Sequence, residues 1–188
     1  KAVKTYNPRN LAPKLLGIID ELPNSPGVFY VHNCTSNILF IGKGKNIRKA
    51  VNQLFLRTSK KARKLQDKVV SVTYQDTGNE LIAQLKFLEE LAENNPVFNF
   101  KPRSEYDEVN FNHDNFIIVD RGRHVGEKSV ILIENNALNG YGYTELNYQL
   151  DNVDILKNLL TPMHDSAQNR FIVKNYLQKK RVEKIIRL

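Results

Sequence analysis

Residues 42–45, with the sequence Gly-Lys-Gly-Lys, are the first in the chain whose types and spacing could do chemistry. They lie between a predicted strand and a predicted helix. Glycines there would let the backbone approach a phosphate group, and a helix N-terminus attracts anions. A Walker loop, however, needs four residues between its first glycine and a Gly-Lys-Ser/Thr, and this chain has neither that gap nor the hydroxyl. The pattern therefore argues against a nucleotide-binding loop.

The histidines and the cysteine form no pattern typical of a metal site or a nucleophile. His32, His113, His124 and His164 lie far apart, and none has a second ligand at helical spacing. Cys34 is the only cysteine and falls in a predicted hairpin turn, which excludes an intrachain disulfide and a multi-cysteine zinc site. We therefore expect no metal and no cofactor, and a reducing cytoplasm as the compartment.

The basic residues are the other group that could bind a ligand. The chain has 28 Lys and Arg against 20 Asp and Glu, a net charge of +8. Between residues 57 and 68, six cations face the single acid Asp67, and this run is either a solvated surface or a face that neutralises phosphates. The overall charge favours DNA binding. A second cluster of cations, over residues 174–187, is expected to be the solvated face of a helix.

The elements that must position these residues follow from apolar periodicity and turn signals. Residues 1–21 predict a linker that runs into a short lead-in helix. The next stretch predicts, in order, a β-hairpin, a helix capped by Asn46, a strand and a long helix, over residues 28–41, 47–55, 69–74 and 80–94.

The second half of the chain has a different pattern. Three extended segments, over residues 116–120, 129–134 and 140–146, predict an antiparallel meander. Helices are expected over residues 153–160 and about 167–187. No apolar run approaches the about 20 residues needed to cross a membrane, so we expect no membrane partner.

Four segments of the first half, 22–30, 38–49, 77–81 and 96–99, resemble the GIY-YIG endonuclease family. The resemblance is to the N-terminal nuclease module of the bacterial excinuclease C protein. It extends to the similar module fused behind a proofreading-type exonuclease in DNA polymerase III epsilon-type proteins. Residues 114–188 resemble the tail that follows the module in those fusions. The resemblance implies a replication or repair protein with a 3′-5′ exonuclease domain upstream, and the start without methionine agrees with this expectation.

The chemistry that the resemblance implies needs residues that this chain has replaced. The family cleaves a phosphodiester with one divalent metal, tyrosine side chains near the attacking water, an arginine on the phosphate and a glutamate ligand. The corresponding positions here are Phe29, Phe40, Ala50 and Phe87. Phenylalanine cannot transfer a proton, and the phosphate clamp and the metal ligand are lost as well. Phosphoryl transfer depends on such positioning and charge stabilisation, so we expect no intact catalytic residue.

Three nearby residues have side chains of the right type to replace the lost groups. Arg48 lies two residues before Ala50, about 200° away around the helix. Tyr30 follows Phe29 along a strand, so its side chain should point to the opposite face of the sheet. Glu90 lies about one helical turn beyond Phe87 and is the one conceivable replacement metal ligand. Magnesium or manganese is expected only if Glu90 has rebuilt the site. The motif positions that survive serve backbone geometry, phosphate approach or packing, and they are Gly27, Gly42, Lys43 and Asn99.

The predicted fold is α/β (α+β). A GIY-YIG-like small antiparallel sheet flanked by helices, residues 22–101, is followed by an α+β region, residues 102–188, with a three-stranded meander and C-terminal helices. The predicted function is a catalytically degenerate module that binds DNA without hydrolysing it. The alternatives are a residual metal-dependent endonuclease and a domain that docks replication or repair proteins. The predicted DNA contacts are Lys43, Lys45, Arg48, Lys49, Arg57, Lys60, Lys61, Arg63 and Lys64.

Overall fold

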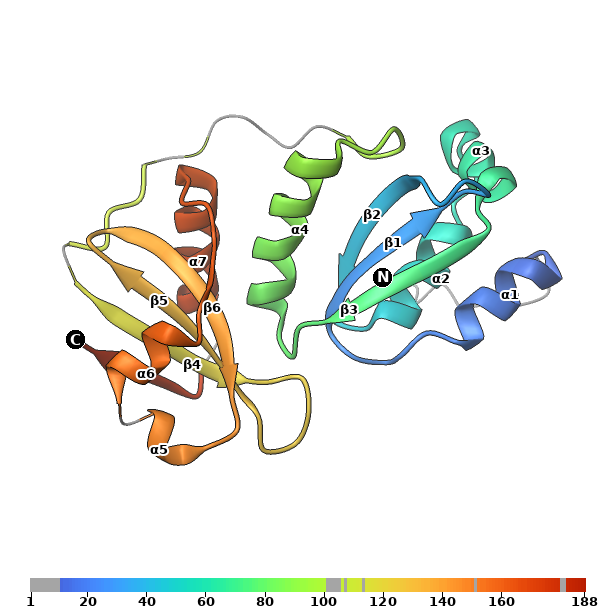
Figure 1. Ribbon diagram of the computed structural model, residues 1–188. Coiled ribbons are helices and arrows are strands. Elements are labelled where there is room, and N and C mark those ends of the chain that lie inside the picture. Colours follow the sequence, from blue (N-terminus) through green and yellow to red (C-terminus); the bar gives the residue numbers. More distant parts are fainter. Residues whose placement is uncertain (1–10, 101–105, 107, 113, 151, 180–181) are drawn as a thin grey trace.

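The computed structural model describes residues 11–100, 106, 108–112, 114–150, 152–179 and 182–188. Two antiparallel sheets lie on either side of one long helix, α4 (Glu80–Asn94), as Figure 1 shows. The predicted boundary between residues 101 and 102, and residues 1–10 of the predicted linker, lie outside the described residues. In the part of the chain that is described, no helix is both long and apolar enough to cross a membrane.

The first sheet has three strands in the order β2-β1-β3, with β1 (Gly27–His32) in the centre. β1 and β2 (Ile38–Gly44) form the predicted hairpin, and β3 (Ser71–Asp76) pairs with the other edge of β1. A bulge opposite Val31 and His32 interrupts the hairpin register. Because β2 is an edge strand, the outer side of its backbone has no neighbouring strand among the described residues.

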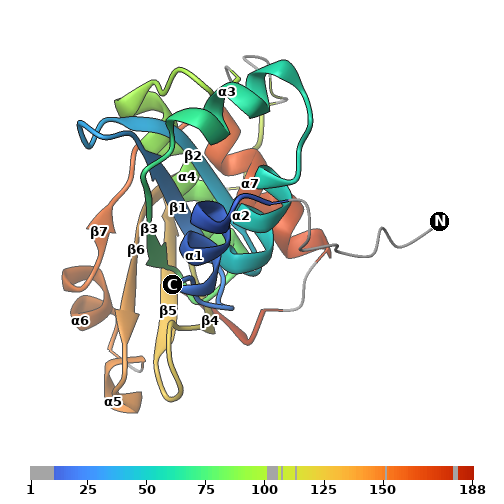
Figure 2. The same cartoon turned by 90° about the vertical axis from the view of Figure 1, so that its right-hand side faces the viewer.

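Three helices belong to the first sheet. α1 (Pro13–Asp20) and α2 (Ile47–Phe55) cover one of its faces, as Figure 2 shows, and α3 (Lys60–Lys68) follows α2. The side chain of Asn46 accepts a hydrogen bond from the Lys49 N–H, so the predicted helix cap is confirmed. The face of the sheet that carries Phe29 and Val31 packs on α1 and α2, and these residues form one core.

α4 packs against both sheets. Leu91 lies in a small core with Val28 and Ile41, on the face of the first sheet opposite Phe29. Leu81, Ile82 and Leu85 belong instead to the core of the second sheet. The helix therefore buries two stripes of side chains and joins the two halves of the molecule.

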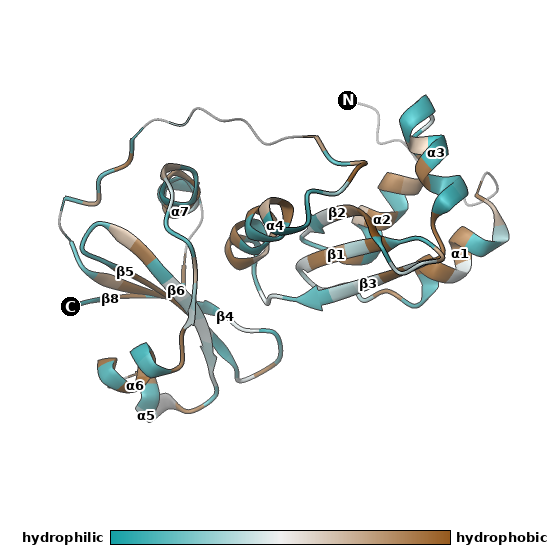
Figure 3. Ribbon diagram, turned by 45° about the horizontal axis from the view of Figure 1, so that its top comes forward, coloured by the Kyte–Doolittle hydropathy of each residue, from teal (hydrophilic) through white to brown (hydrophobic). Residues whose placement is uncertain are grey.

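The second sheet has five strands in the order β7-β6-β5-β4-β8. Its centre is the predicted meander of β4 (Phe116–Arg121), β5 (Lys128–Glu134) and β6 (Ala137–Thr144). One face packs on α4 and α7 (Ala167–Lys179), which lie side by side in Figures 1 and 3. The other face packs on α6 (Val153–Asn158), which follows the short α5 (Asn147–Leu150).

The predicted helix over residues 167–187 is wrong in its second half. α7 ends at Lys179, and β8 (Lys184–Arg187) is a strand that pairs with β4. Isoleucines at 185 and 186 favour a strand, and the open edge of β4 supplies the hydrogen bonds that a strand needs. On the other edge, the two-residue β7 (Thr161–Pro162) pairs with β6, so the meander is the centre of a larger sheet.

Candidate functional site

A hollow of about 290 Å³ lies at the edge of β2, where the two faces of the first sheet meet. Phe29 pairs with Gly42 and Phe40 pairs with Val31, so these side chains lie on the α2 face. Lys43 is the residue after Gly42 along β2, so its side chain lies on the opposite face of the sheet, toward α4. The structure brings together the four positions at which the resemblance implies catalytic groups, because the hollow is lined by Phe29, Phe40, Ala50 and Phe87.

The aromatic rings at these positions pack tightly on the strand. Phe29 is only 2% exposed, and the centroids of the Phe29 and Phe40 rings are 6.2 Å apart. A Cβ atom at Gly42 would lie 2.1 Å from Cζ of Phe29. The absence of a side chain at Gly42 therefore makes room for the Phe29 ring, which gives this glycine a packing role.

The charges at the hollow are positive. Lys43 Nζ lies 5.7 Å from the centroid of the Phe87 ring, and Arg57 also lines the hollow. Desolvation lowers the pKa of Lys43, and the negative charge of Glu80 offsets part of this effect. Among the described lining residues there is no carboxylate. Divalent cations such as magnesium bind oxygen ligands, chiefly carboxylates, so these residues do not fit a divalent metal, whereas they fit an anion.

Glu90 is engaged elsewhere. Its carboxylate accepts a hydrogen bond of 3.0 Å from the Tyr30 hydroxyl and forms an ion pair of 3.2 Å with Lys86. Burial and the bond to Glu90 raise the pKa of Tyr30. Tyr30 pairs with Ile41 and lies on the face opposite Phe29, as the alternation along the strand predicts. Neither Tyr30 nor Glu90 lines the hollow, so this pair fastens α4 to β1.

Two more of the residues predicted as retained motif positions have structural roles. The Asn99 side chain accepts a hydrogen bond from the Ile41 N–H and donates one to the Ile41 carbonyl, at 2.9 and 2.8 Å. Asn99 thus pairs with the open edge of β2 as a neighbouring strand would. At Gly27, a Cβ atom would lie 2.2 Å from the Gln75 carbonyl oxygen, so the close pairing of β1 and β3 requires a glycine.

The predicted DNA contacts fall into two groups. Some already have partners within the protein: Lys45 forms an ion pair of 2.7 Å with Glu80, and the Arg48 guanidinium donates to the carbonyls of Leu22 and Asp20. The others are exposed at or beyond the hollow. They are Lys43 on β2, Lys49 on α2, Arg57 after it, and Lys60, Arg63 and Lys64 on α3. Lys61 belongs to the first group, because its Nζ atom donates to the Asn99 carbonyl.

α3 is hydrophilic along most of its length, as Figure 3 shows. Arg57 connects it to the hollow, because this residue also lines a neighbouring depression together with Arg63. Lys61 Nζ donates to the Asn99 carbonyl at 3.3 Å and lies 4.1 Å from the centroid of the Phe100 ring. The basic surface, defined as Lys43, Arg57, Lys60, Arg63 and Lys64, is therefore continuous with the hollow.

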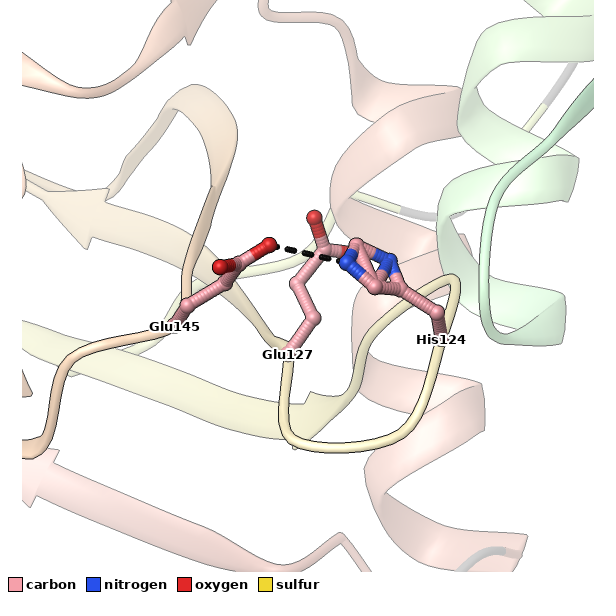
Figure 4. A group of neighbouring side chains, drawn as sticks. All are labelled: His124, Glu127 and Glu145. Atoms are coloured by element: carbon pink, nitrogen blue, oxygen red, sulfur yellow. Dashed lines mark hydrogen bonds and ion pairs between the residues drawn. The ribbon is translucent and has the colours of Figure 1, made fainter.

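Sequence reasoning missed one cluster of side chains, His124, Glu127 and Glu145, which point toward one another in Figure 4. The His124 Nε2 atom lies 2.8 Å from a Glu145 oxygen, and its Nδ1 atom lies 3.6 Å from Glu127. Pairing of Lys128 with Thr144 places the two glutamates side by side. A correct prediction of the register between β5 and β6 would have revealed this cluster from the sequence.

Arg123 already neutralises the buried member of this cluster. Glu127 is 4% exposed, and it accepts hydrogen bonds from the Arg123 N–H at 2.6 Å and from its guanidinium. These bonds lower the pKa of Glu127. A cation would have to compete with the guanidinium for the same oxygens. The cluster is therefore explained as a set of ion pairs that holds the loop between β4 and β5.

Comparison with known proteins finds similarity in the first half of the chain. Residues 25–103 match the model of the UvrC-like GIY-YIG domain. The chain is 34% identical over 91 residues to the UvrABC system protein C of Bacteroides thetaiotaomicron, and 32% identical over 84 residues to that of Methanococcoides burtonii. These matches cover 47% and 43% of this chain and 14% of each relative.

A solved structure is also similar. It is the GIY-YIG N-terminal endonuclease domain of UvrC from Thermotoga maritima, bound to its catalytic divalent cation, magnesium. The TM-score is 0.43 with 19% sequence identity, over 48% of this chain and all of that chain. In the match to the domain model and in the sequence relatives, residues 25–103 of this chain are therefore similar to the UvrC-like GIY-YIG domain.

Proposed function

We propose that this GIY-YIG domain binds DNA through its basic surface and does not hydrolyse it. The observation that carries the proposal is the composition of the hollow. Phe29, Phe40, Ala50 and Phe87 meet there, and the charged side chains that accompany them are cations. A site of this kind attracts a phosphate and has no group that accepts a proton from water.

Binding rests on the cations around the hollow. Lys43 and Arg57 would contact the phosphate nearest the strand edge, and Lys60, Arg63 and Lys64 would follow the backbone along α3. Lysine and arginine neutralise phosphates and release counterions, so this contact is independent of sequence and sensitive to salt. Lys45 and Arg48 contribute less, because their charged groups already have partners within the protein.

Hydrolysis requires what the replaced side chains cannot supply. A phenyl ring at Phe40 cannot take a proton, and Ala50 cannot hold the charge that develops on the phosphate. The Phe87 ring supports the Lys43 ammonium through a cation–π contact where the resemblance implies a metal ligand. The site therefore retains the attraction for a phosphodiester and lacks the means to cleave it.

The wider context belongs to the same proposal. We place the chain in a replication or repair protein of the DNA polymerase III epsilon type, with a 3′-5′ exonuclease domain upstream. The resemblance of residues 114–188 to the tail of such proteins supports this context. No magnesium or manganese is needed by the module itself.

The first test combines nicking and binding on one preparation. Supercoiled plasmid is incubated with the chain and magnesium, then manganese, and binding to a labelled duplex is titrated at low and moderate salt. We expect binding that weakens steeply with salt, and no nicking. Replacing Lys60 and Lys64 together by alanine should reduce the slope of log affinity against log salt by about 1 to 2.

The matched control removes two exposed cations from β8, as Lys184→Ala with Arg187→Ala, and should leave the slope unchanged. Nicking that survives repurification and disappears in Glu90→Ala would overturn the proposal in favour of a rebuilt endonuclease. Absence of both binding and nicking would favour a protein-docking role.

A further inference from the structure

A second groove, of about 550 Å³, lies between α4 and α7. It adjoins the hollow, since Lys43 and Phe87 line both. The two helices run side by side in Figures 1 and 3. A strand of DNA held at the hollow would therefore have this groove as its next surface.

Aromatic rings recur along the lining of the groove. Five of them, from three separate parts of the sequence, are Phe87, Phe100, Tyr106, Phe171 and Tyr176. Phe100 is 81% exposed, an unusual position for a large apolar ring. Tyr106 and Phe171 pack with ring centroids 5.5 Å apart, and the Tyr106 hydroxyl accepts a hydrogen bond from Gln168.

The polar groups of the groove complement a nucleic acid. Lys43 and Lys179 are its lining cations, and Lys61 lies against the Phe100 ring. Glu80 is the acid among the described lining residues, and its charge is offset by the ion pair with Lys45. The amides of Gln84, Gln168 and Asn175 lie among the rings and can bond to the edges of bases.

Rings interleaved with lysines are typical of proteins that bind single strands, where bases stack on the aromatic side chains and cations track the backbone. Duplex DNA keeps its bases stacked inside and cannot use such a surface. We propose that the groove between α4 and α7 binds unpaired bases of a DNA strand that continues from the hollow. This inference rests on the proposed DNA binding and specifies the form of DNA bound.

The test compares a blunt duplex with a duplex of the same length that carries an oligothymidine tail, by fluorescence anisotropy. The tailed duplex should bind at least about five-fold more tightly, which is the lower end of what one stacked base contributes. Phe100→Ala should remove most of this gain, whereas Phe100→Trp should keep it. Because the Phe100 ring is exposed, its removal should leave the fold intact, and circular dichroism checks this.

The matched control is Tyr148→Ala, which removes another exposed aromatic ring, 62% exposed on α5 and outside the groove. It should leave the gain intact. A 2-aminopurine placed in the tail reports stacking directly, since its fluorescence falls when it stacks. That quenching should disappear in Phe100→Ala.

The outcomes separate the two proposals. If the blunt duplex binds and the tail adds neither affinity nor quenching, the groove has another role and this inference is overturned, while the proposed function stands. If neither DNA binds, the proposed function itself fails. If the Phe100→Ala variant keeps the full gain in affinity for the tailed duplex, the inference is also overturned.

Discussion

Phe29, Phe40, Ala50 and Phe87, at the positions where the resemblance implies catalytic groups, form one packing arrangement around the hollow. The Phe29 and Phe40 rings pack against each other, and the absence of a side chain at Gly44 makes room for the Cβ atom of Ala50. A phenyl ring at Phe87 can support the Lys43 ammonium, where a carboxylate would pair with it directly. Reverting one of these residues should therefore not restore hydrolysis, because each reversion would add a single polar group to an otherwise apolar and cationic site.

Gly42 is the residue on which this packing depends. We expect Gly42→Ala to lower the free energy of unfolding by about 1–3 kcal/mol, because its Cβ atom would overlap the buried Phe29 ring. Urea unfolding followed by far-UV circular dichroism measures the change. Gly17→Ala in α1 is the matched control. No atom lies within 4 Å of its added Cβ, so alanine there should be neutral or stabilising.

A double variant tests the cause. Combining Gly42→Ala with Phe29→Ala removes the ring that clashes, so the loss from the two changes together should be smaller than the sum of the single losses. Strict additivity would show that Gly42 is needed for some reason other than the Phe29 ring.

At the scale of elements, local signals in the sequence were sufficient for most of the first sheet. The hairpin, the Asn46 cap of α2 and the bounds of α4 were predicted, because turn residues, caps and apolar periodicity are encoded locally. β8 was not, since residues 182–187 continue a helical spacing and become a strand only through the edge of β4. That edge depends on contacts distant in sequence.

The candidate site, too, could be predicted from the sequence only in part. The four positions were found through resemblance to a family. The sheet register explains why Phe29 and Phe40 meet, and the packing of α2 and α4 against β2 brings Ala50 and Phe87 to them. The groove between α4 and α7 was missed, because its rings are spread from residue 87 to residue 176 and only the packing of the two helices brings them together.

Asn99 shows how a single side chain can complete an element. We expect Asn99→Ala to lower the free energy of unfolding by about 1–3 kcal/mol, because the N–H and carbonyl of the buried Ile41 lose their partners. Asn99→Asp keeps an acceptor for the N–H and places a carboxylate against the carbonyl, so it should also destabilise. Urea unfolding of both variants checks this.

The control for Asn99 is Asn94→Ala, which removes an exposed amide that donates hydrogen bonds to Glu90, one turn earlier in the helix. Its effect should stay within about 0.5 kcal/mol. Unchanged stability of Asn99→Ala with altered DNA binding would assign Asn99 to the ligand and not to the fold.

At the scale of the whole molecule, α4 determines whether the chain behaves as one unit or two. Its two stripes of apolar side chains lie in the cores of different sheets. The side chain of Asn79, at its start, also donates to the Arg121 carbonyl and to the Ser129 hydroxyl, at 3.0 and 2.8 Å. Separation of the halves would expose one stripe and leave these polar groups unsatisfied, which opposes independent opening.

We therefore expect the two sheets to open cooperatively, despite the predicted boundary after residue 101. Ile82→Ala removes a fully buried side chain from the core of the second sheet and should cost about 2–5 kcal/mol. Hydrogen exchange measured by mass spectrometry should then show loss of protection in β1 as well as in β4. The reciprocal variant, Leu54→Ala in the first core, should in turn lower protection in β4. If each substitution affects only its own sheet, the halves open separately, and α4 stays folded with whichever sheet remains intact.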